Sequence, residues 1–589
     1  MERGVRQGCP ISPLLFILTL ELLARDIRKN KNIIGIKLAP NASPIKIKMY
    51  ADDASFFLRD QMDYREVLSR IKLFSHFSGL CLNKNKSAAM YIGDPSHDKQ
   101  FKFGIKFVNK IKILGIIFSN EKAASEIKEN FENKIMQLER LCCLWEKRSL
   151  TIIGKITILK CFGISLFIYI MQSIGLSDFY IKRINTIMFK FIWNSKANNK
   201  MKIIEKVKRD YICRNKESGG LGMTHLAKLQ DSFYLKWADK LLTEPLSDSG
   251  QSWKIIPTHI FTPVGGLSVF NSSVQKNDFK GEILIKSFFW RKVLYSWIGY
   301  NKNDNPVQRC SIYDPIFNNS LIRFKNRPLF IEGCIKRSMI FIKDFISGGQ
   351  ILSFDDFRSK FGNFADTIFA YNIIYNALNN VKDIINENYF IENDQENFSQ
   401  FHFRDLKTGN ITRKSYYNMI RDNEVISVHN SLRTKFDLDE QDSELWLIPF
   451  KSVSEVKLIQ LQWKLLHNIY PTGTLLYKMK IKNNENCDIC GERDTPLHCF
   501  VLCPIAKEVW KDAENCIFKI SSQVIKLNEK IIMIGLFNDT LVYSRIIQNL
   551  VNKICLIGKF SISKYRYFRQ GKISILFEKE LLLRNMIMR

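Results

Sequence analysis

The chain has 589 residues, enough for several domains that each bury their own core, so we expect more than one domain. Its 88 Lys and Arg residues outnumber 58 Asp and Glu, giving a net charge of +30 that favours a polyanionic partner. Nucleic acid is the first expectation. An anionic membrane surface or a merely soluble basic protein remains open from composition alone.

The cysteine usage and the apolar stretches point to an intracellular protein without a membrane span. Most of the 14 cysteines stand alone among apolar or mixed neighbours, which is typical of a reducing compartment. The residues after Met1 lack the apolar core of a secretory signal. The longest apolar stretch, residues 161–176, is shorter than the roughly 20 residues of a spanning helix, so we expect a buried helix there.

A loop and a helix open the chain. The loop is Arg6-Gln7-Gly8-Cys9-Pro10. Ser12 and Pro13 then predict a helix start, with Ser12 as the N-cap and Pro13 at the first helical position. The helix should run to about Asn30, and its nearly all-round apolar first half predicts a core helix.

An acidic pair follows at a predicted hairpin. Apolar Ile45, Ile47 and Met49 alternate with lysines, and residues 56–58 are apolar, which predicts two short strands around Asp52-Asp53. Adjacent carboxylates at a hairpin tip suit hard, oxygen-preferring Mg²⁺ ions. A helix is predicted next over residues 64–77, ended by Ser78-Gly79.

These motifs resemble the reverse transcriptases of non-LTR (LINE-type) retrotransposons. Residues 4–16 are similar to that family's loop and helix beneath the template and incoming nucleotide, and Tyr50-Ala51-Asp52-Asp53 to its metal-binding hairpin. The resemblance implies that Asp52 and Asp53 are catalytic Mg²⁺ ligands. It also implies that Arg6, Gln7, Gly8 and Tyr50 contact the nucleotide and template.

The resemblance continues downstream. Lys86, in residues 78–87, matches a palm lysine near the nucleotide phosphates, although an ordinary solvated lysine is the alternative. Leu114 and Gly115 match the primer-grip hairpin, but the family commonly has an aromatic residue where Ile113 stands.

A helical thumb is expected over residues 121–240. Helical periodicity puts Leu138, Leu141, Cys142 and Trp145 on one side. Further family markers are Leu150, Gly154-Lys155, Phe191-Ile192-Trp193 and Gly219-Gly220-Leu221-Gly222. Lys147, Arg148, Lys155 and Lys160 are candidate contacts to the primer–template backbone, with a solvated helix face as the alternative.

Residues 241–445 carry no assigned chemistry. Pro and Gly residues suggest a boundary near 241–275, and a polar stretch at 392–410 reads as a second break. The aromatic residues at 288–290 and Trp297 are expected to pack in a core rather than stack on bases.

A zinc site is predicted near the C-terminus from Cys487-x2-Cys490-x7-His498-x4-Cys503. Cys499 is a competing ligand. Trp463-x3-His467, Pro471-Thr472 and Trp510 also resemble the family's zinc-knuckle region. Because the spacing differs from the shorter retroviral knuckle, we do not expect retroviral-style base recognition. The positive charge of the chain is consistent with a structural zinc that presents basic and aromatic side chains to unpaired RNA.

The predicted fold class is α+β: a partial polymerase palm with an acidic hairpin (1–120), a helical thumb (121–240), a mostly helical region (241–445), a zinc-binding module (446–515) and a basic C-terminal tail (516–589). In the resembled family a further aspartate lies upstream of the Arg-Gln-Gly loop. Because only seven residues precede Gly8, we expect an N-terminally truncated enzyme that lacks this aspartate and the fingers and is inactive alone.

The implied activity is RNA-directed DNA synthesis from deoxynucleoside triphosphates, with an RNA template, a DNA primer and Mg²⁺. The family further implies a ribonucleoprotein in nucleus and cytoplasm. A catalytically dead nucleic-acid-binding remnant is the alternative. A group II intron-like maturase is more distant, because the Cys/Cys/His/Cys cluster argues against it. The sequence leaves the oligomeric state open.

Overall fold

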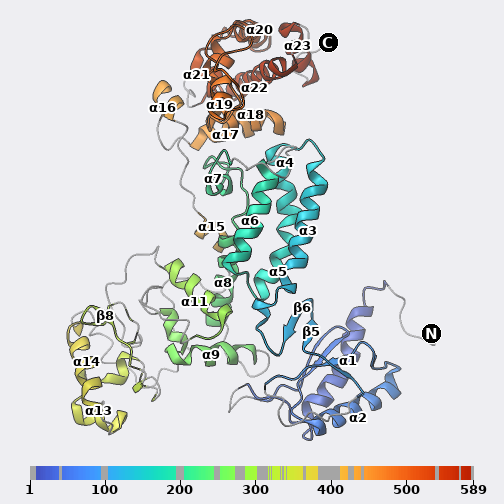
Figure 1. Cartoon of the computed structure of the whole chain (residues 1–589), viewed down its shortest axis with the longest axis vertical. Coiled ribbons are helices and arrows are strands. Elements are labelled where there is room, and N and C mark those ends of the chain that lie inside the picture. Colours follow the sequence, from blue (N-terminus) through green and yellow to red (C-terminus); the bar gives the residue numbers. More distant parts are fainter. Residues whose placement is uncertain are drawn as a thin grey trace. The chain divides into compact units, whose positions relative to one another are not determined.

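The structure is a computed structural model of the chain (Figure 1). It describes residues 8–38, 43–93, 104–193, 205–243, 252–264, 266–271, 285–301, 316–317, 319, 321–331, 333–334, 337, 339, 341–362, 367–382, 411–421, 430–438, 443–537, 543–568 and 572–584. These residues form two compact units. Unit 1 contains residues 1–132, 170–176 and 230–418, and unit 2 contains residues 133–169, 177–229 and 419–589.

The described structure is rich in helices and has only small sheets, as the α+β prediction expects. Every sheet in the described ranges has two strands, and β3–β4 is the parallel one. Up to residue 132, the elements are α1 (Ser12–Lys29), β1 (Ile47–Tyr50), β2 (Asp53–Phe56), α2 (Gln61–Ser78), β3 (Ala88–Ala89), β4 (Lys106–Phe107), β5 (Lys110–Ile113), β6 (Ile116–Ser119) and η1 (Ala124–Glu126).

The first part of unit 1 packs α1 and α2 together beside the β1–β2 hairpin (Figure 1). Its core consists of Leu23, Ile27, Ile33, Ile47 and Val67. Helix α2 begins after Asp60, whose side chain accepts the Asp63 N–H, and ends at Gly79 in the left-handed conformation. The predicted end of this helix is therefore confirmed.

Helix α1 differs from the prediction in two ways. Its N-cap is Ile11, without a side-chain hydrogen bond, and Ser12 is already helical, so the prediction of Ser12 as the cap is wrong. Only its second half is buried: Leu23, Ala24 and Ile27 face the core, while Leu14 and Leu18 are 63% and 65% exposed. Apolar composition predicted a core helix, but no described element covers the first half.

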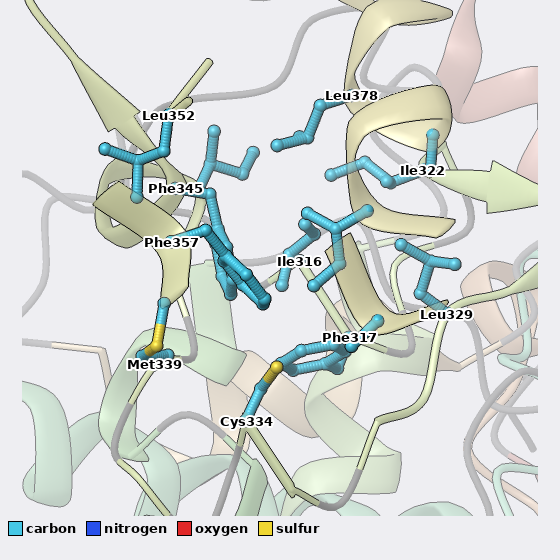
Figure 2. Packing of buried hydrophobic residues seen from close by; sticks show 14 of the residues in the cluster. Ile316, Phe317, Ile322, Leu329, Cys334, Met339, Phe345, Leu352, Phe357 and Leu378 are labelled. Atoms are coloured by element: carbon cyan, nitrogen blue, oxygen red, sulfur yellow. The ribbon is translucent and has the colours of Figure 1, made fainter. Parts of the chain in front are cut away.

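The later part of unit 1 begins in α8 (Leu226–Thr243) and includes a small compact region with its own core. Figure 2 shows this core, which joins Phe317 and Ile322 to Phe345, Phe357 and Leu378. The elements are η3 (Ser252–Lys254), α9 (Ile255–Phe261), η4 (Thr262–Val264), η5 (Gly266–Asn271), α11 (Phe288–Asn301), β7 (Arg323–Phe324), β8 (Arg327–Pro328), η6 (Ile342–Phe345), β9 (Ile346–Ser347), β10 (Gln350–Ile351), α13 (Phe354–Phe361), α14 (Thr367–Asn379) and α15 (Arg413–Ile420).

The aromatic residues of α11 pack as expected. Trp290 and Trp297 are buried, and the Trp297 indole N–H donates to the Phe270 carbonyl oxygen at 2.7 Å. The second predicted break, residues 392–410, lies outside the described residues.

Unit 2 is helical in its described ranges. Its elements are α3 (Glu129–Glu146, from residue 133), α4 (Ile152–Ile158), η2 (Leu159–Gly163), α5 (Ser165–Ser173, to residue 169), α6 (Asp178–Trp193), α7 (Arg209–Cys213), α16 (Asn430–Phe436), α17 (Ser443–Ser452), α18 (Val456–Leu466), α19 (Gly473–Lys478), η9 (His498–Leu502), α20 (Pro504–Ser521), α21 (Glu529–Met533), α22 (Arg545–Phe568) and α23 (Ile573–Leu583).

The residues that we expected to form a basic C-terminal tail fold as helices. Helix α22 packs against α17, α18, α20 and α23 and buries Val551, Ile554 and Ile557. The tail prediction is therefore wrong for the described residues of this segment, because the apolar residues of α22 form a buried face.

A search of the described residues finds no single helix long and apolar enough to cross a membrane. The pair 152–163 and 165–173, bent by 47°, meets that test by length and composition.

Candidate catalytic hairpin and metal centre

The predicted acidic hairpin is present. Strands β1 and β2 are antiparallel, and Tyr50 pairs with Asp53 across the turn formed by Ala51 and Asp52. Ala51 has a φ of 51°, so the turn is tight. Both aspartates and Tyr50 are exposed at the tip, where two adjacent carboxylates can face a solvent-borne cation.

Two buried polar side chains that sequence reasoning missed hold this hairpin in place. Asp63 is 1% exposed, and its carboxylate accepts the backbone N–H groups of Ile34 (2.7 Å), Gly35 (2.9 Å) and Arg59 (3.0 Å). Lys46 is also buried, and its ammonium donates to the carbonyl oxygens of Arg28 and Asn30 at the C-terminal end of α1. The hairpin base is thereby tied to α1 and α2.

The remaining candidates for nucleotide contact lie in loops. Arg6 and Gln7 are outside the described residues, and Gly8 is the first described residue, with a φ of 91°. Lys86 is exposed in a short turn, where its backbone N–H donates to the Asn83 carbonyl oxygen at 3.2 Å. An exposed ammonium on a short turn is able to reach a phosphate, which is what the Lys86 role requires.

The second predicted hairpin is also present. Strands β5 and β6 pair from Lys110↔Ser119 to Ile113↔Ile116, and Leu114 and Gly115 form the turn with φ values of 46° and 85°. Both turn residues are exposed. The hairpin geometry agrees with a primer grip, and the contact with a primer remains a prediction.

One predicted phosphate contact is wrong. Lys155 is 5% exposed, and its ammonium donates to the Phe191 carbonyl oxygen at 2.9 Å, near the end of α6. Burial lowers the pKa of Lys155. Lys155 therefore stabilises a helix C-terminus, whereas Lys147, Arg148 and Lys160 are exposed.

Two family markers far apart in the sequence meet within unit 2. The Trp463 indole N–H donates to the Gly219 carbonyl oxygen at 2.9 Å, and His467 Nε2 lies 3.0 Å from the same oxygen. Trp446 packs on the His467 ring, with centroids 4.7 Å apart. The glycine-rich loop is thereby clamped onto α17 and α18.

Gly219 is one of two adjacent positions in this loop that leave no room for a side chain, since a Cβ at Gly220 would lie 2.2 Å from the Arg214 carbonyl oxygen. Gly219 has a φ of +86°, and an added Cβ would lie 2.7 Å from the Trp446 ring. We expect Gly219→Ala to destabilise unit 2 by about 2–5 kcal/mol, the sum of left-handed strain and overpacking. Gly222→Ala is the matched control, since its φ is +67° but its Cβ would meet no atom within 4 Å. Urea unfolding measures both, and equal losses would contradict the clamp.

The predicted metal ligands come together. Cys487, Cys490, His498 and Cys503 place one ligand atom each within 4.8 Å of all the others, and no further such group of His, Cys, Asp or Glu is found among the described residues. Cys490 Sγ lies 3.1 Å from His498 Nε2. Tetrahedral zinc needs ligand atoms about 3.5–4 Å apart. The donor set fits Zn²⁺, and the Cys490–His498 pair lies a few tenths of an ångström closer than a bound ion would require.

The surroundings favour the metal-binding protonation state at Cys487 and His498, whereas burial raises the pKa of Cys503 to about 12. Burial raises the pKa of the Cys487 thiol, but backbone N–H groups of Ile489 and Cys490 outweigh it, and the net shift is downward. Burial lowers the pKa of His498, which favours the neutral imidazole. Cys499 is fully buried and is not in the cluster, so the structure does not use it as a replacement ligand.

Two family models match the chain. Residues 1–118 match the model described as reverse transcriptase (RNA-dependent DNA polymerase), and residues 413–510 match the model described as zinc-binding in reverse transcriptase. The first segment contains the β1–β2 hairpin, Lys86 and the β5–β6 hairpin up to residue 118, and the second contains all four residues of the metal cluster.

Two curated proteins are similar to parts of the chain. The Transposon TX1 uncharacterized 149 kDa protein of Xenopus laevis is 20% identical over 572 residues, which cover 85% of this chain and 40% of that protein. An uncharacterized mitochondrial protein of Arabidopsis thaliana is 40% identical over 57 residues, which cover 9% of this chain and 47% of that protein. The matches therefore span less than half the length of each relative.

Proposed function

Because the chain belongs to the reverse transcriptases of non-LTR retrotransposons, we propose that it is an RNA-directed DNA polymerase whose reaction takes place at the β1–β2 hairpin. The observation that carries this proposal is the exposed Asp52-Asp53 pair at the tip of a buttressed hairpin inside the matched segment. In this reaction a primer 3′-hydroxyl attacks the α-phosphate of a deoxynucleoside triphosphate, and pyrophosphate leaves.

Asp52 and Asp53 would hold Mg²⁺ in this proposal. When bound, the ions neutralise phosphate charge and activate the attacking hydroxyl. Lys86 would stabilise the charge that develops on the leaving pyrophosphate. Arg6, Gln7, Gly8 and Tyr50 would shape the nucleotide and template pocket, and Leu114 and Gly115 would contact the primer.

The family matches and the metal cluster support the remaining assignments, whereas the two compact units do not follow the predicted domain bounds. We propose that residues 1–120 act as a palm, that the helices of 121–240 act as a thumb on the primer–template backbone, and that a structural zinc organises the module around Cys487. The RNA template and DNA primer are the proposed partners, in a ribonucleoprotein of nucleus and cytoplasm.

Primer extension on an RNA template with Mg²⁺ tests the polymerase proposal. The proposal departs from the expectation above that the chain is inactive alone: extension should occur with the wild-type chain and be lost in Asp52→Asn. Equal extension by both proteins would overturn the assignment of Asp52.

A second candidate function is binding of single-stranded RNA by the zinc module. Exposed Tyr477 and Ile481 lie beside exposed Lys478 and Lys480 at the end of α19, which combines stacking and cationic groups. This candidate does not depend on catalysis by Asp52.

Replacing Lys478 and Lys480 together with glutamine is expected to weaken RNA binding and make it less salt-dependent. Each lost phosphate contact should lower the slope of log K against log salt by about 0.7 for a single strand. Filter binding of an unstructured RNA at several salt concentrations measures the slope. Lys579→Gln is the control, because Lys579 is exposed on α23, and a slope unchanged in the double variant would contradict this surface.

A further inference from the structure

We propose that Arg566, on the C-terminal helix α22, is an outer partner of the zinc centre, and that metal binding and docking of α22 stabilise each other. The inference rests on the zinc role in the proposed function. It adds a residue that lies outside the matched zinc-binding segment, which ends at residue 510.

The Arg566 guanidinium joins two groups of the metal module. Its Nη2 lies 2.6 Å from Asp494 Oδ2, and its Nη1 donates to Cys487 Sγ at 3.6 Å. The side chains of Arg566 and Asp494 are 16% and 2% exposed. A cation that is largely withdrawn from water contacts one of the four predicted ligands directly.

Asp494 extends this contact to the start of the module. Its Oδ2 also accepts the Gly473 N–H at 2.5 Å, and its backbone carbonyl oxygen accepts from Thr474. Arg566 therefore connects α22 to the segment that carries Cys487 and Asp494 and, through Asp494, to the start of α19. Tyr470 adds a second link, because its hydroxyl donates to Ser563 Oγ at 2.8 Å.

The net charge of a zinc-loaded centre explains why a cation at this position would be stabilising. Three thiolates and one neutral imidazole around Zn²⁺ carry a net charge of −1, which is costly among the buried Cys487, His498 and Cys503. A guanidinium N–H aimed at a ligand sulfur offsets that charge and fixes the ligand orientation. Among the described residues, Arg566 makes such a contact, with Cys487 Sγ.

Coupling between metal and helix follows from reciprocity. If Arg566 raises zinc affinity only when α22 is docked, bound zinc must stabilise docked α22 by the same factor. Loss of zinc should therefore loosen the C-terminal end of α22, 63 residues beyond the last ligand (566 − 503).

The first test measures zinc affinity of the full chain by competition with a chromogenic chelator. Arg566→Gln is expected to bind zinc about 10–100-fold more weakly than wild type. Arg566→Lys keeps the positive charge but loses the paired N–H donors of the guanidinium, so its zinc affinity should fall by less than that of Arg566→Gln. Arg545→Gln is the matched control, because Arg545 is exposed at the other end of α22. Equal affinity of Arg566→Gln and Arg545→Gln would overturn the proposal.

The second test uses the wild-type chain and does not depend on a variant folding. Hydrogen exchange of residues 545–568 is followed with and without chelator, and exchange near residue 566 should increase when zinc is removed. Unchanged exchange in a chain that has demonstrably lost zinc would overturn the coupling. A wild-type chain that contains no zinc at all would instead overturn the proposed zinc role itself, which separates the two failures.

Discussion

Cys503→Ala is expected to abolish zinc binding and unfold the zinc module, whereas Cys499→Ala keeps one zinc per chain. The two cysteines are both buried and lie four positions apart, but only Cys503 places its sulfur in the ligand cluster. Structural zinc in small domains contributes apparent binding free energies of about 10–16 kcal/mol, comparable to the whole stability of a typical domain.

The Cys499→Ala variant should lose far less stability than Cys503→Ala. Removing one buried sulfur leaves a small cavity and costs on the order of 1–2 kcal/mol. Zinc content by atomic absorption, together with thermal unfolding with and without chelator, measures both variants. Equal zinc content in the two variants would show that Cys503 is not a ligand.

Asp52→Asn is expected to lower Mg²⁺-dependent primer extension by about 10³-fold or more, since losing about 4 kcal/mol of transition-state stabilisation corresponds to that factor. Asparagine has the shape of aspartate but not its charge, and Asp52 is exposed in the turn, so the hairpin should keep its fold. Circular dichroism of the variant checks this point.

Glu121→Gln is the matched control for Asp52→Asn. Glu121 is exposed just after β6 in the same unit, so the variant loses an equal charge at a residue outside the acidic pair. The control should extend primers at the wild-type rate. If neither wild type nor control extends a primer while both bind RNA, the binding function replaces the polymerase proposal for this polypeptide.

The local parts of the site could be predicted because their signals are short-range. The alternation before Asp52, the turn at Leu114-Gly115 and the spacing of Cys487 to Cys503 each fix a hairpin or knuckle within a few residues. The structure confirms the two hairpins and the cluster.

Surface or core position could not be read from those patterns, because it depends on partners that are distant in sequence. Lys46 and Lys155 look like solvated lysines in the sequence, yet both are buried against carbonyl oxygens at helix ends. Leu14 and Leu18 look like core residues, yet they are exposed.

The sequence by itself indicated the family, the acidic pair and the four candidate metal ligands, since these depend on residue type and spacing alone. Only the tertiary structure decided that Gly219 is clamped by Trp463 and that Arg566 reaches Cys487. Those contacts join residues 244 and 79 positions apart, and such pairs are set by how whole helices pack rather than by any local periodicity.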